Sequence, residues 1–179
     1  MRDRKLLNIE LGRISPEKYK SLPESGLVVV LDNIRSSHNV GSVLRTADSF
    51  KVDKVWLCGI TAVPPSAEIH KSALGAEDSV EWEHRDDTAQ VIKALQSEGY
   101  TVVSVEQTLH SVKMDKFVPG KGGRYALVFG NEVDGVRQDV VDASDMSLEV
   151  PQWGTKHSLN VSVCVGVVLW HFVLARLNG

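Results

Sequence analysis

The segment GLVVVLDNIRSSHNVGSVLRTA, from Gly26 to Ala47, combines a buried strand with an amphipathic helix. Its first part, residues 26–32, is a β-branched apolar run between a glycine and an aspartate, which is typical of a strand buried on both faces. From Asn39 onward, apolar residues recur at the i, i+3, i+4 and i+7 positions of a helix: Val40, Val43, Leu44 and Ala47. A buried strand followed by such a helix predicts the first unit of a parallel α/β sheet.

The rest of the chain repeats this alternation. Short apolar runs bounded by turn residues predict further strands at residues 54–58, 79–83, 100–105, 125–129 and 146–150. Helical patterns between them predict helices at residues 67–74, 136–143 and 158–177, and another that begins at Asp87 and ends before Gly99. The expected fold class is therefore α/β, with a mostly parallel sheet, helices on both faces and right-handed crossovers.

Composition limits the class of protein. The chain has 179 residues, of which 42% are hydrophobic and 24% are charged. These values predict one globular domain and exclude disordered, collagen-like and disulfide-scaffold proteins. The formal net charge is −3, so the chain lacks the overall basic excess of a protein that coats nucleic acid. Any contact with nucleic acid must involve local basic segments.

Three features of the sequence bear on the compartment. Cys58 and Cys164 each lie in an apolar run, which indicates reduced core residues and favours the cytoplasm. The N-terminus is basic, but no apolar stretch of signal-peptide length follows it, so we do not expect secretion. Residues 159–175 are mostly apolar, yet three polar residues among them favour a buried helix over a membrane span.

Several common ligand-binding motifs are absent from the sequence. No G-x-G-x-x-G follows a predicted strand, and the glycine-rich run from Gly120 to Arg124 lacks the spacing of a P-loop. A Rossmann-type nucleotide-binding enzyme is therefore disfavoured. The histidines and cysteines lack metal-ligand spacing, so we expect no bound metal.

Three polar segments follow predicted strands, at the edge where open α/β sheets bind ligands: residues 32–47, 129–135 and 150–161. In the first, a polar loop opens the helix and leaves Asn39 and Arg45 off its apolar face. In the second, glycines bracket two acidic residues and let the backbone approach a ligand closely. The third is a glycine-containing loop that runs into the last helix.

These segments resemble the three motifs of the SpoU/TrmH family of RNA 2′-O-ribose methyltransferases, within the SPOUT superfamily. The family pattern N-x-G-[SA]-[IV]-x-R-T-A is met by NVGSVLRTA at residues 39–47. The pattern F-G-N-E-x-x-G is met by residues 129–135, and P-x-x-G-x-x-x-S-L-N-V-S is met by residues 151–162. The resemblance extends over residues 27–174, with Lys51 in place of a common glycine and Cys164 in place of a common alanine.

The resemblance implies an S-adenosylmethionine-dependent enzyme that methylates the ribose 2′-hydroxyl of a nucleotide in tRNA or rRNA. It also implies a homodimer and a catalytic domain at residues 26–179, which follows a short basic leader at residues 1–25. A deep trefoil knot near the C-terminus rests wholly on the resemblance, because general topology rules argue against knots. Neither a metal nor a membrane is an expected partner. The alternative function is a knotted dimeric RNA-binding protein without catalytic turnover.

The resemblance places five residues in the catalytic site: Arg45, Asn39, Ser158, Asn160 and Glu132. Arg45 would either lose its proton and act as a base or, as we prefer, hold the adjacent phosphate and stabilise the developing alkoxide. Simpler structural roles remain open for these residues. Arg45 could pair with Asp48 on the helix surface, Asn39 and Ser158 could cap helices, and Glu132 could anchor its loop.

The implied cofactor pocket consists mainly of backbone groups, with apolar side chains around the adenine. Its candidate residues are Leu127, Val128, Phe129, Gly130, Asn131, Val150, Pro151, Gln152, Trp153, Ser158 and Leu159. The last predicted helix is apolar on nearly every face, which indicates packing against a partner subunit as well as against its own sheet.

Charge is segregated along the chain. Residues 1–20 carry six basic and three acidic residues, and the loop at residues 113–124 carries four basic residues and one acidic residue. Residues 77–87 carry six acidic residues and one basic residue, so RNA phosphates favour the first two regions. The candidate RNA-binding residues are Arg35, Lys113, Lys116, Lys121 and Arg124. We expect no room for an added RNA-binding domain, so recognition should come from the leader, the catalytic surface and a second subunit.

Overall fold

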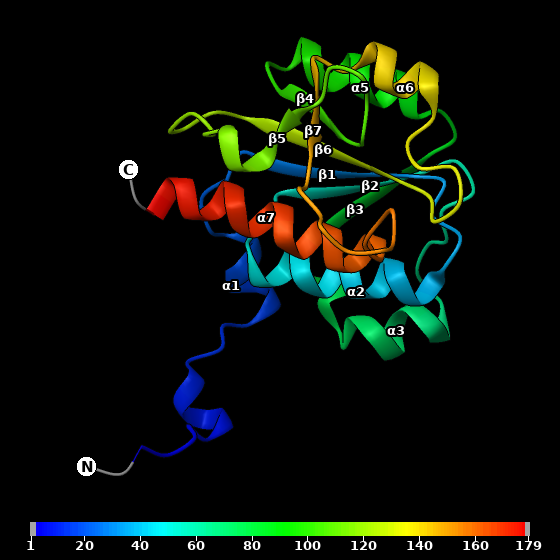
Figure 1. The fold of residues 1–179 in the computed structure, drawn as a ribbon. Helices are drawn as coiled ribbons and strands as arrows, with labels where there is room; N and C mark the ends of the chain where they lie inside the picture. The colour runs from blue at the N-terminus through cyan, green and yellow to red at the C-terminus, as the bar shows by residue number, and fades with distance from the viewer. Residues whose placement is uncertain (1–2, 178–179) are drawn as a thin grey trace.

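In the computed structural model, which describes residues 3–177, the chain forms one sheet covered by helices on both faces (Figure 1). Within these residues, seven strands lie in the order β3-β2-β1-β6-β4-β7-β5, and all neighbouring pairs are parallel. The strands are β1 (Leu27–Asp32), β2 (Lys54–Cys58), β3 (Glu81–Arg85), β4 (Thr101–Val105), β5 (Val112–Lys113), β6 (Tyr125–Gly130) and β7 (Met146–Glu149). The predicted α/β class is confirmed. Arg2 of the predicted leader and the last two residues of the predicted domain lie outside the described residues.

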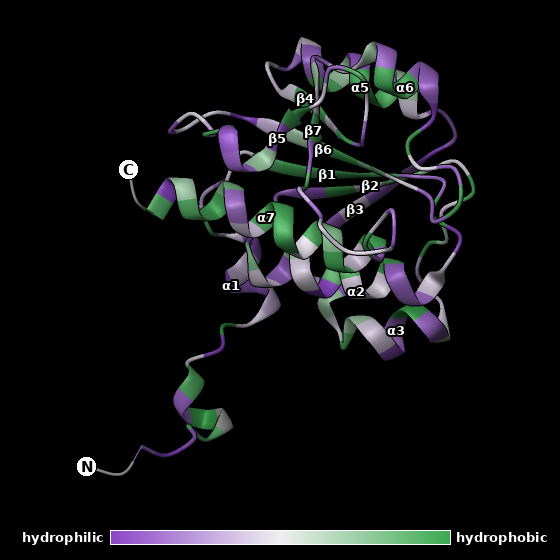
Figure 2. Ribbon diagram, in the orientation of Figure 1, coloured by the Kyte–Doolittle hydropathy of each residue, from purple (hydrophilic) through white to green (hydrophobic). Residues whose placement is uncertain are grey.

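Helices cover both faces of the sheet, as predicted. One face carries α1 (Pro16–Lys20), α2 (Ser37–Ser49), α3 (Ala67–Ala73), α4 (Ala76–Ser79) and α7 (Val161–Leu177). The other face carries α5 (Thr88–Ser97) and α6 (Gln138–Ala143), and the chain also contains the 3₁₀ turns η1 (Asn8–Leu11) and η2 (Met114–Lys116). Figure 2 shows hydrophobic residues along the central strands and along α7.

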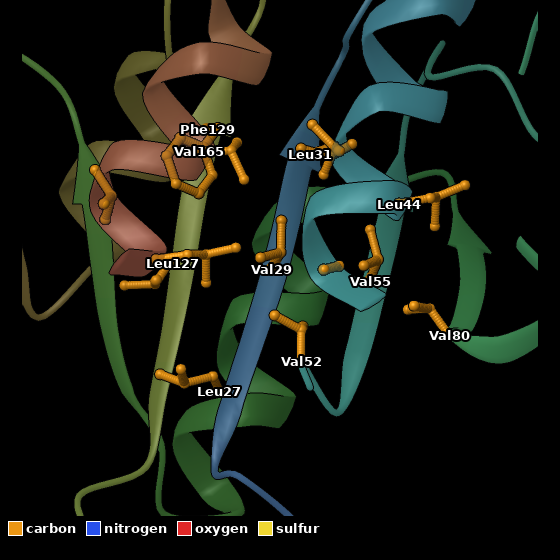
Figure 3. Close-up of a cluster of buried hydrophobic side chains, with 14 of the residues drawn as sticks. Leu27, Val29, Leu31, Leu44, Val52, Val55, Val80, Leu127, Phe129 and Val165 are labelled. Carbon is orange, nitrogen blue, oxygen red and sulfur yellow. The ribbon is translucent and has the colours of Figure 1, made fainter. Parts of the chain in front are cut away.

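Strand β1 is buried because its side chains alternate between two apolar clusters. Leu27, Val29 and Leu31 pack with α2 and α7 in the larger cluster, whereas Val28 and Val30 pack with α5 and α6 in the smaller one. Figure 3 shows the larger cluster, in which side chains of β1 lie between those of β6 and α2. Burial of one such side chain stabilises the fold by about 1.5–3 kcal/mol. The carboxyl ends of these rigid central strands support the polar segments that follow them.

The predicted helices and strands are present with local shifts. The third strand starts later than expected because residues 76–79 form the short helix α4. The second helix starts at Ser37 because the Ser36 hydroxyl accepts a hydrogen bond from the Asn39 N–H group at 3.2 Å. The last helix starts at Val161 rather than at residue 158. These differences all concern element ends, where side-chain caps compete with the hydrophobic pattern.

The chain changes faces of the sheet between β7 and α7. Helix α6 packs against α5 on one face, and β7 pairs with β4 inside the sheet. Residues 150–160 then lead to α7, which packs against α2 on the other face. This crossing brings the third polar segment beside the ends of β4 and β6. The passage of the chain through a knot stays a prediction.

The N-terminal residues fall into two parts. Residues 3–15 extend away from the domain (Figure 1), whereas α1 packs against it through the buried Tyr19. The Tyr19 hydroxyl lies 3.4 Å from the carbonyl oxygens of Ala47 and Val52. The predicted leader therefore includes a helix that joins the core, and its boundary at residue 25 stays a prediction. In the part of the chain that the structure describes, no helix is long and apolar enough to cross a membrane.

Candidate functional site

A cavity of about 530 Å³ lies at the carboxyl ends of β4, β6 and β7. Its walls come from the residues that follow these strands and from the segment that enters α7: residues 105–107, 129–135, 148–150, 152, 157–161 and 164. The second and third polar segments thus line one cavity, at the edge of the sheet where the sequence predicts a ligand site.

Two glycines shape the turn that follows β6 and forms one wall of the cavity. Asn131 and Gly135 exchange two backbone hydrogen bonds of 3.1 Å, which close a tight turn. A Cβ atom on Gly130 would lie within 3.0 Å of the Gly135 backbone, and Gly135 itself has a φ of +69°, which favours glycine. The Asn131 side chain accepts hydrogen bonds from the N–H groups of Val133 and Asp134 at 2.9 and 2.8 Å. The FGNEVDG sequence therefore specifies the shape of this wall.

A chain of side-chain hydrogen bonds joins the three polar segments beside the cavity. Asn39 Nδ2 donates to Glu132 Oε1 at 2.7 Å, which links the first segment to the second. Asn160 Nδ2 donates to Asn39 Oδ1 at 3.2 Å, which links the third segment to the first. Asn160 Oδ1 in turn accepts from the N–H and hydroxyl groups of Ser162 at 2.9 and 2.7 Å. Asn39, at the centre of this chain, is only 7% exposed.

Glu132 also anchors its turn to the segment that precedes α2. Its second carboxylate oxygen accepts a hydrogen bond from the Arg35 N–H group at 3.3 Å. Burial acts to raise the pKa of the Glu132 carboxyl, but the hydrogen bonds from Asn39 and from backbone N–H groups outweigh burial and lower the pKa from its ordinary value. An ionised carboxylate held at both oxygens is suited to organising the site rather than to exchanging protons.

Arg45 lies apart from this chain of hydrogen bonds. It is exposed on α2, about 9 Å along the helix axis from Asn39, and it does not line the cavity. Among residues 3–177, its guanidinium has neither an ion-pair nor a hydrogen-bond partner, so a surface pair with Asp48 is not seen. Ser36 rather than Asn39 is the N-cap of α2, and Ser158 lies on the cavity wall three residues before α7 begins.

The candidate cofactor residues separate into those that line the cavity and those that do not. The lining residues are Phe129, Gly130, Asn131, Val150, Gln152, Ser158 and Leu159. Leu127 and Val128 lie further back in β6 and are buried in the two apolar clusters. Pro151 and Trp153 belong to the third segment but do not line the cavity, and Trp153 is 92% exposed.

Some residues that line the cavity lie outside the three motifs and were not predicted from the sequence. Glu106 and Gln107 directly follow β4, and Glu149 ends β7. The Glu106 carboxylate accepts hydrogen bonds from the Gln107 N–H group at 2.8 Å and the Val136 N–H group at 3.0 Å, which tie the end of β4 to the turn after β6. Their places at the carboxyl ends of predicted strands are the signal that could have found them.

Two candidate RNA-binding residues lie near the cavity. The Arg35 guanidinium is 3.8 Å from the carboxylate of Asp134, a cavity residue. Lys113 pairs in register with Glu149, another cavity residue, across β5 and β7. Both residues therefore lie at the same edge of the sheet as the cavity.

The other candidate RNA-binding residues lie elsewhere. Arg124 directly precedes β6 and so lies at the opposite edge of the sheet, where its guanidinium stacks over the Tyr100 ring at 4.1 Å. Lys116 and Lys121 lie in the segment between β5 and β6, and Lys116 forms an ion pair with Asp115 at 3.0 Å. The structure thus does not bring the five candidates together into one surface.

The cavity combines apolar walls with a few polar groups, as ligand sites in proteins commonly do. Val105, Phe129 and Leu148 supply apolar surface, while strand ends and the amide of Asn160 supply hydrogen-bonding groups. Within residues 3–177, no group of three or more His, Cys, Asp or Glu side chains is arranged to hold a metal ion. This chemistry suits an organic ligand that has both apolar and hydrogen-bonding parts.

Comparison with known proteins identifies relatives over most of the chain. Residues 26–170 match the model of the SpoU rRNA Methylase family. The chain is 33% identical over 155 residues to the 23S rRNA (guanosine-2′-O-)-methyltransferase RlmB of Vibrio cholerae, in an alignment that covers 86% of this chain and 61% of the relative. The chain thus spans about three fifths of the length of such curated relatives.

Solved structures share the fold. The TrmH/SpoU tRNA modifying enzyme of A. aeolicus superposes with a TM-score of 0.79 at 26% identity, covering 91% of this chain and 81% of that chain. The AdoMet-bound rRNA methyltransferase of Sinorhizobium meliloti superposes with a TM-score of 0.77 at 26% identity, covering 93% of this chain and 61% of that chain.

Proposed function

Because this chain belongs to the SpoU rRNA methylase family, we propose that it transfers a methyl group from S-adenosylmethionine to a ribose 2′-hydroxyl of RNA. The relatives support this proposal: one is named as a 23S rRNA guanosine-2′-O-methyltransferase, and another is an rRNA methyltransferase solved with AdoMet bound. A third relative is named as a tRNA modifying enzyme. We therefore propose a nucleotide in rRNA or tRNA as the substrate.

The residues around the cavity fit S-adenosylmethionine. Gly130 and Gly135 keep side chains out of one wall, so backbone groups there can contact a ligand. We propose that the backbone from Phe129 to Asn131 and the segments 150–153 and 158–159 hold the cofactor, with Leu127 and Val128 supporting them from the core. When bound, the cofactor supplies a methyl group on a positively charged sulfonium, whose leaving group is a neutral thioether.

The observation that carries this proposal is the chain of hydrogen bonds from Glu132 through Asn39 to Asn160. It joins the three segments that resemble the family motifs, beside a cavity of suitable size. Amide side chains both donate and accept hydrogen bonds, so Asn39 and Asn160 suit recognition of a ribose hydroxyl or a phosphate. We assign Glu132 to organising this arrangement, and the Ser158 hydroxyl to a hydrogen bond with the substrate or a neighbouring catalytic side chain.

We propose that Arg45 acts on the RNA rather than on the cofactor. Its guanidinium is exposed and, within residues 3–177, has no partner that would hold it away from a phosphate. We favour an arginine that stays charged, holds the adjacent phosphate and stabilises the developing alkoxide, because the guanidinium group is a fixed donor of several hydrogen bonds to phosphate oxygens. An arginine that loses its proton and acts as a base is the second mechanism.

We also propose a homodimer that forms through α7. Partly exposed apolar side chains follow one another along this helix at i, i+4, i+7 and i+11: Val163, Val167, Trp170 and Leu174. A continuous apolar stripe of this kind is unfavourable in water and is typical of an interface between subunits. Arg35, Lys113, Lys116, Lys121 and Arg124 would then contribute to an RNA surface shared by two subunits.

The remaining parts of the proposal concern the domain and its compartment. We propose a knotted catalytic domain at residues 26–179 and a leader at residues 1–25 that contacts RNA. Cys58 and Cys164 are free thiols, which supports a reducing compartment such as the cytoplasm.

Transfer of tritium from labelled S-adenosylmethionine to rRNA and tRNA tests the function. We expect transfer by the native chain and a loss of about 100-fold or more in Arg45→Ala, with unchanged cofactor binding. Arg137→Ala is the matched control, because Arg137 pairs with Asp139 on the surface, and it should keep full transfer. Mapping of the 2′-O-methyl sites that disappear when the gene is deleted then identifies the nucleotide.

Two outcomes would contradict these assignments. Undiminished transfer by Arg45→Ala would refute the role of Arg45 in the reaction. Calorimetry that detects RNA binding but no cofactor binding, together with no transfer, would favour an RNA-binding protein without turnover.

A further inference from the structure

The cavity has an unbalanced charge. Of the described residues that line it, four are acidic and none is lysine or arginine: the acidic residues are Glu106, Glu132, Asp134 and Glu149. A cavity built for a phosphate or another anion would carry basic side chains instead. The charge therefore suits a cationic ligand.

Most of these carboxylates are held by neutral groups, so their charge is not cancelled by a neighbouring cation. Glu106 accepts hydrogen bonds from two backbone N–H groups, and Glu149 accepts one from the Ser111 hydroxyl at 2.9 Å. Asp134 faces Arg35, but their separation is 3.8 Å and both side chains are more than half exposed, so water screens that pair. Among the described residues, Glu106 forms no ion pair with a lysine or arginine.

The position of Glu106 is set by the fold. It is the first residue after β4, and its hydrogen bond from Val136 draws the carboxylate against Gly135 in the turn after β6. A Cβ atom on Gly135 would lie within 3.0 Å of Glu106 Oε2, so a glycine is needed for the carboxylate to lie there. Glu106 is thus placed between two walls of the cavity.

The negative charge of Glu106 also acts on Cys164, which lies on another wall of the cavity. Burial, and secondarily the Glu106 carboxylate, raise the pKa of the Cys164 thiol to about 11. Cys164 lies on α7 and lines the same cavity. A ligand in this space would experience the same negative field.

We propose that Glu106 makes the cavity select the positively charged sulfonium donor over the neutral thioether product. This inference rests on the proposed methyltransferase function. The donor and the product carry the same ammonium and carboxylate groups and differ by a methyl group and the sulfonium charge. A carboxylate in the cavity therefore favours the donor, and the preference ends when the methyl group leaves, which assists product release.

Isothermal titration calorimetry with the full chain tests this selection. Wild type and Glu106→Gln are titrated with S-adenosylmethionine, S-adenosylhomocysteine and sinefungin, in which a protonated amine replaces the sulfonium. We expect Glu106→Gln to bind the two cationic ligands about 5- to 10-fold more weakly and the neutral product less than about twofold more weakly. Glu98→Gln is the matched control, because Glu98 is exposed at the end of α5, on the opposite edge of the sheet, and should leave every affinity unchanged.

Glutamine keeps an oxygen that can accept one of the two backbone hydrogen bonds, and circular dichroism checks that the variant folds. If it does not fold, the salt dependence of wild type replaces it: added KCl should weaken binding of the donor and leave the product unaffected. Equal weakening of donor and product in Glu106→Gln, or equal salt dependence, would overturn the proposal and would indicate a contact with a shared group such as the ribose. Failure of wild type to bind either ligand would instead refute the proposed function itself.

Discussion

Replacement of Asn39 by alanine tests the hydrogen-bonded core of the site. Asn39 is 7% exposed, donates to Glu132 at 2.7 Å and accepts from Asn160 at 3.2 Å. A hydrogen bond to a charged group contributes about 1.5–3 kcal/mol and a neutral one about 1 kcal/mol, so we expect Asn39→Ala to lower the free energy of unfolding by about 2.5–4 kcal/mol. For a chain of this length, that loss corresponds to a fall in Tm of roughly 5–16 °C.

Equilibrium urea unfolding, followed by tryptophan fluorescence, measures this loss. Ser42→Ala on the same helix is the matched control, because the Ser42 hydroxyl bonds only the His38 carbonyl within the helix, and it should change stability by less than about 0.5 kcal/mol. A double-mutant cycle with Glu132→Ala isolates the pair, for which we expect a coupling of about 1–2 kcal/mol.

A loss below about 0.5 kcal/mol in Asn39→Ala, or a coupling near zero in the cycle, would refute the reasoning. Either result would mean that the three segments are held by packing alone. The hydrogen bonds would then be a consequence of the fold rather than a constraint on the site.

Three further predictions concern charge, the interface and the turn. The pKa of Glu132 is lowered from its ordinary value of 4.5, so its contribution to stability is complete above that pH and is lost as the pH falls below it. In urea unfolding at several pH values, the difference in the free energy of unfolding between wild type and Glu132→Gln should therefore shrink from pH 7 to pH 3. Trp170→Asp places a charge on the exposed stripe of α7. We expect light scattering to show a dimer for wild type and a monomer for this variant; a variant that is as dimeric as wild type would exclude this interface. Gly135→Ala strains a φ of +69° and forces the Glu106 carboxylate aside, so we expect a loss of at least about 2 kcal/mol and weak cofactor binding. Gly154→Ala, where a Cβ meets nothing within 4 Å, should change neither quantity.

The central strands could be predicted because a short apolar run between turn residues indicates a buried strand by itself, without knowledge of the neighbouring strands. The run from Leu27 to Leu31 is apolar at every position, and the structure buries it on both faces. The start of β3 could not be predicted, because α4 has only four residues and carries no readable helical period. Helix α4 ends at Ser79, which is the first residue of the strand predicted at residues 79–83, and β3 therefore begins only at Glu81.

The candidate site was predictable as a set of segments but not as an arrangement. Asn39, Glu132 and Asn160 all lie in the recognised motifs. Their hydrogen bonds, however, join residues that are 93 and 121 positions apart in the sequence, and a local sequence pattern cannot predict contacts between residues so far apart. Glu106 lies outside every motif, and only its place after a strand connects it to the cavity. The reverse holds for Arg45: it lies in a clear motif, but it does not line the cavity.

The order of strands in the sheet has a consequence for synthesis on the ribosome. Strand β1 is central in the finished sheet, but one of its two neighbours, β6, is made about a hundred residues later. At about 5–20 residues per second, the backbone N–H and C=O groups on one side of β1 stay unpaired for roughly 5–20 s until that neighbour is made, while β2 already pairs with the other side. During each round of translation, β1, which is apolar from Leu27 to Leu31, therefore has one unpaired side, and aggregation of nascent chains competes with folding until β6 emerges.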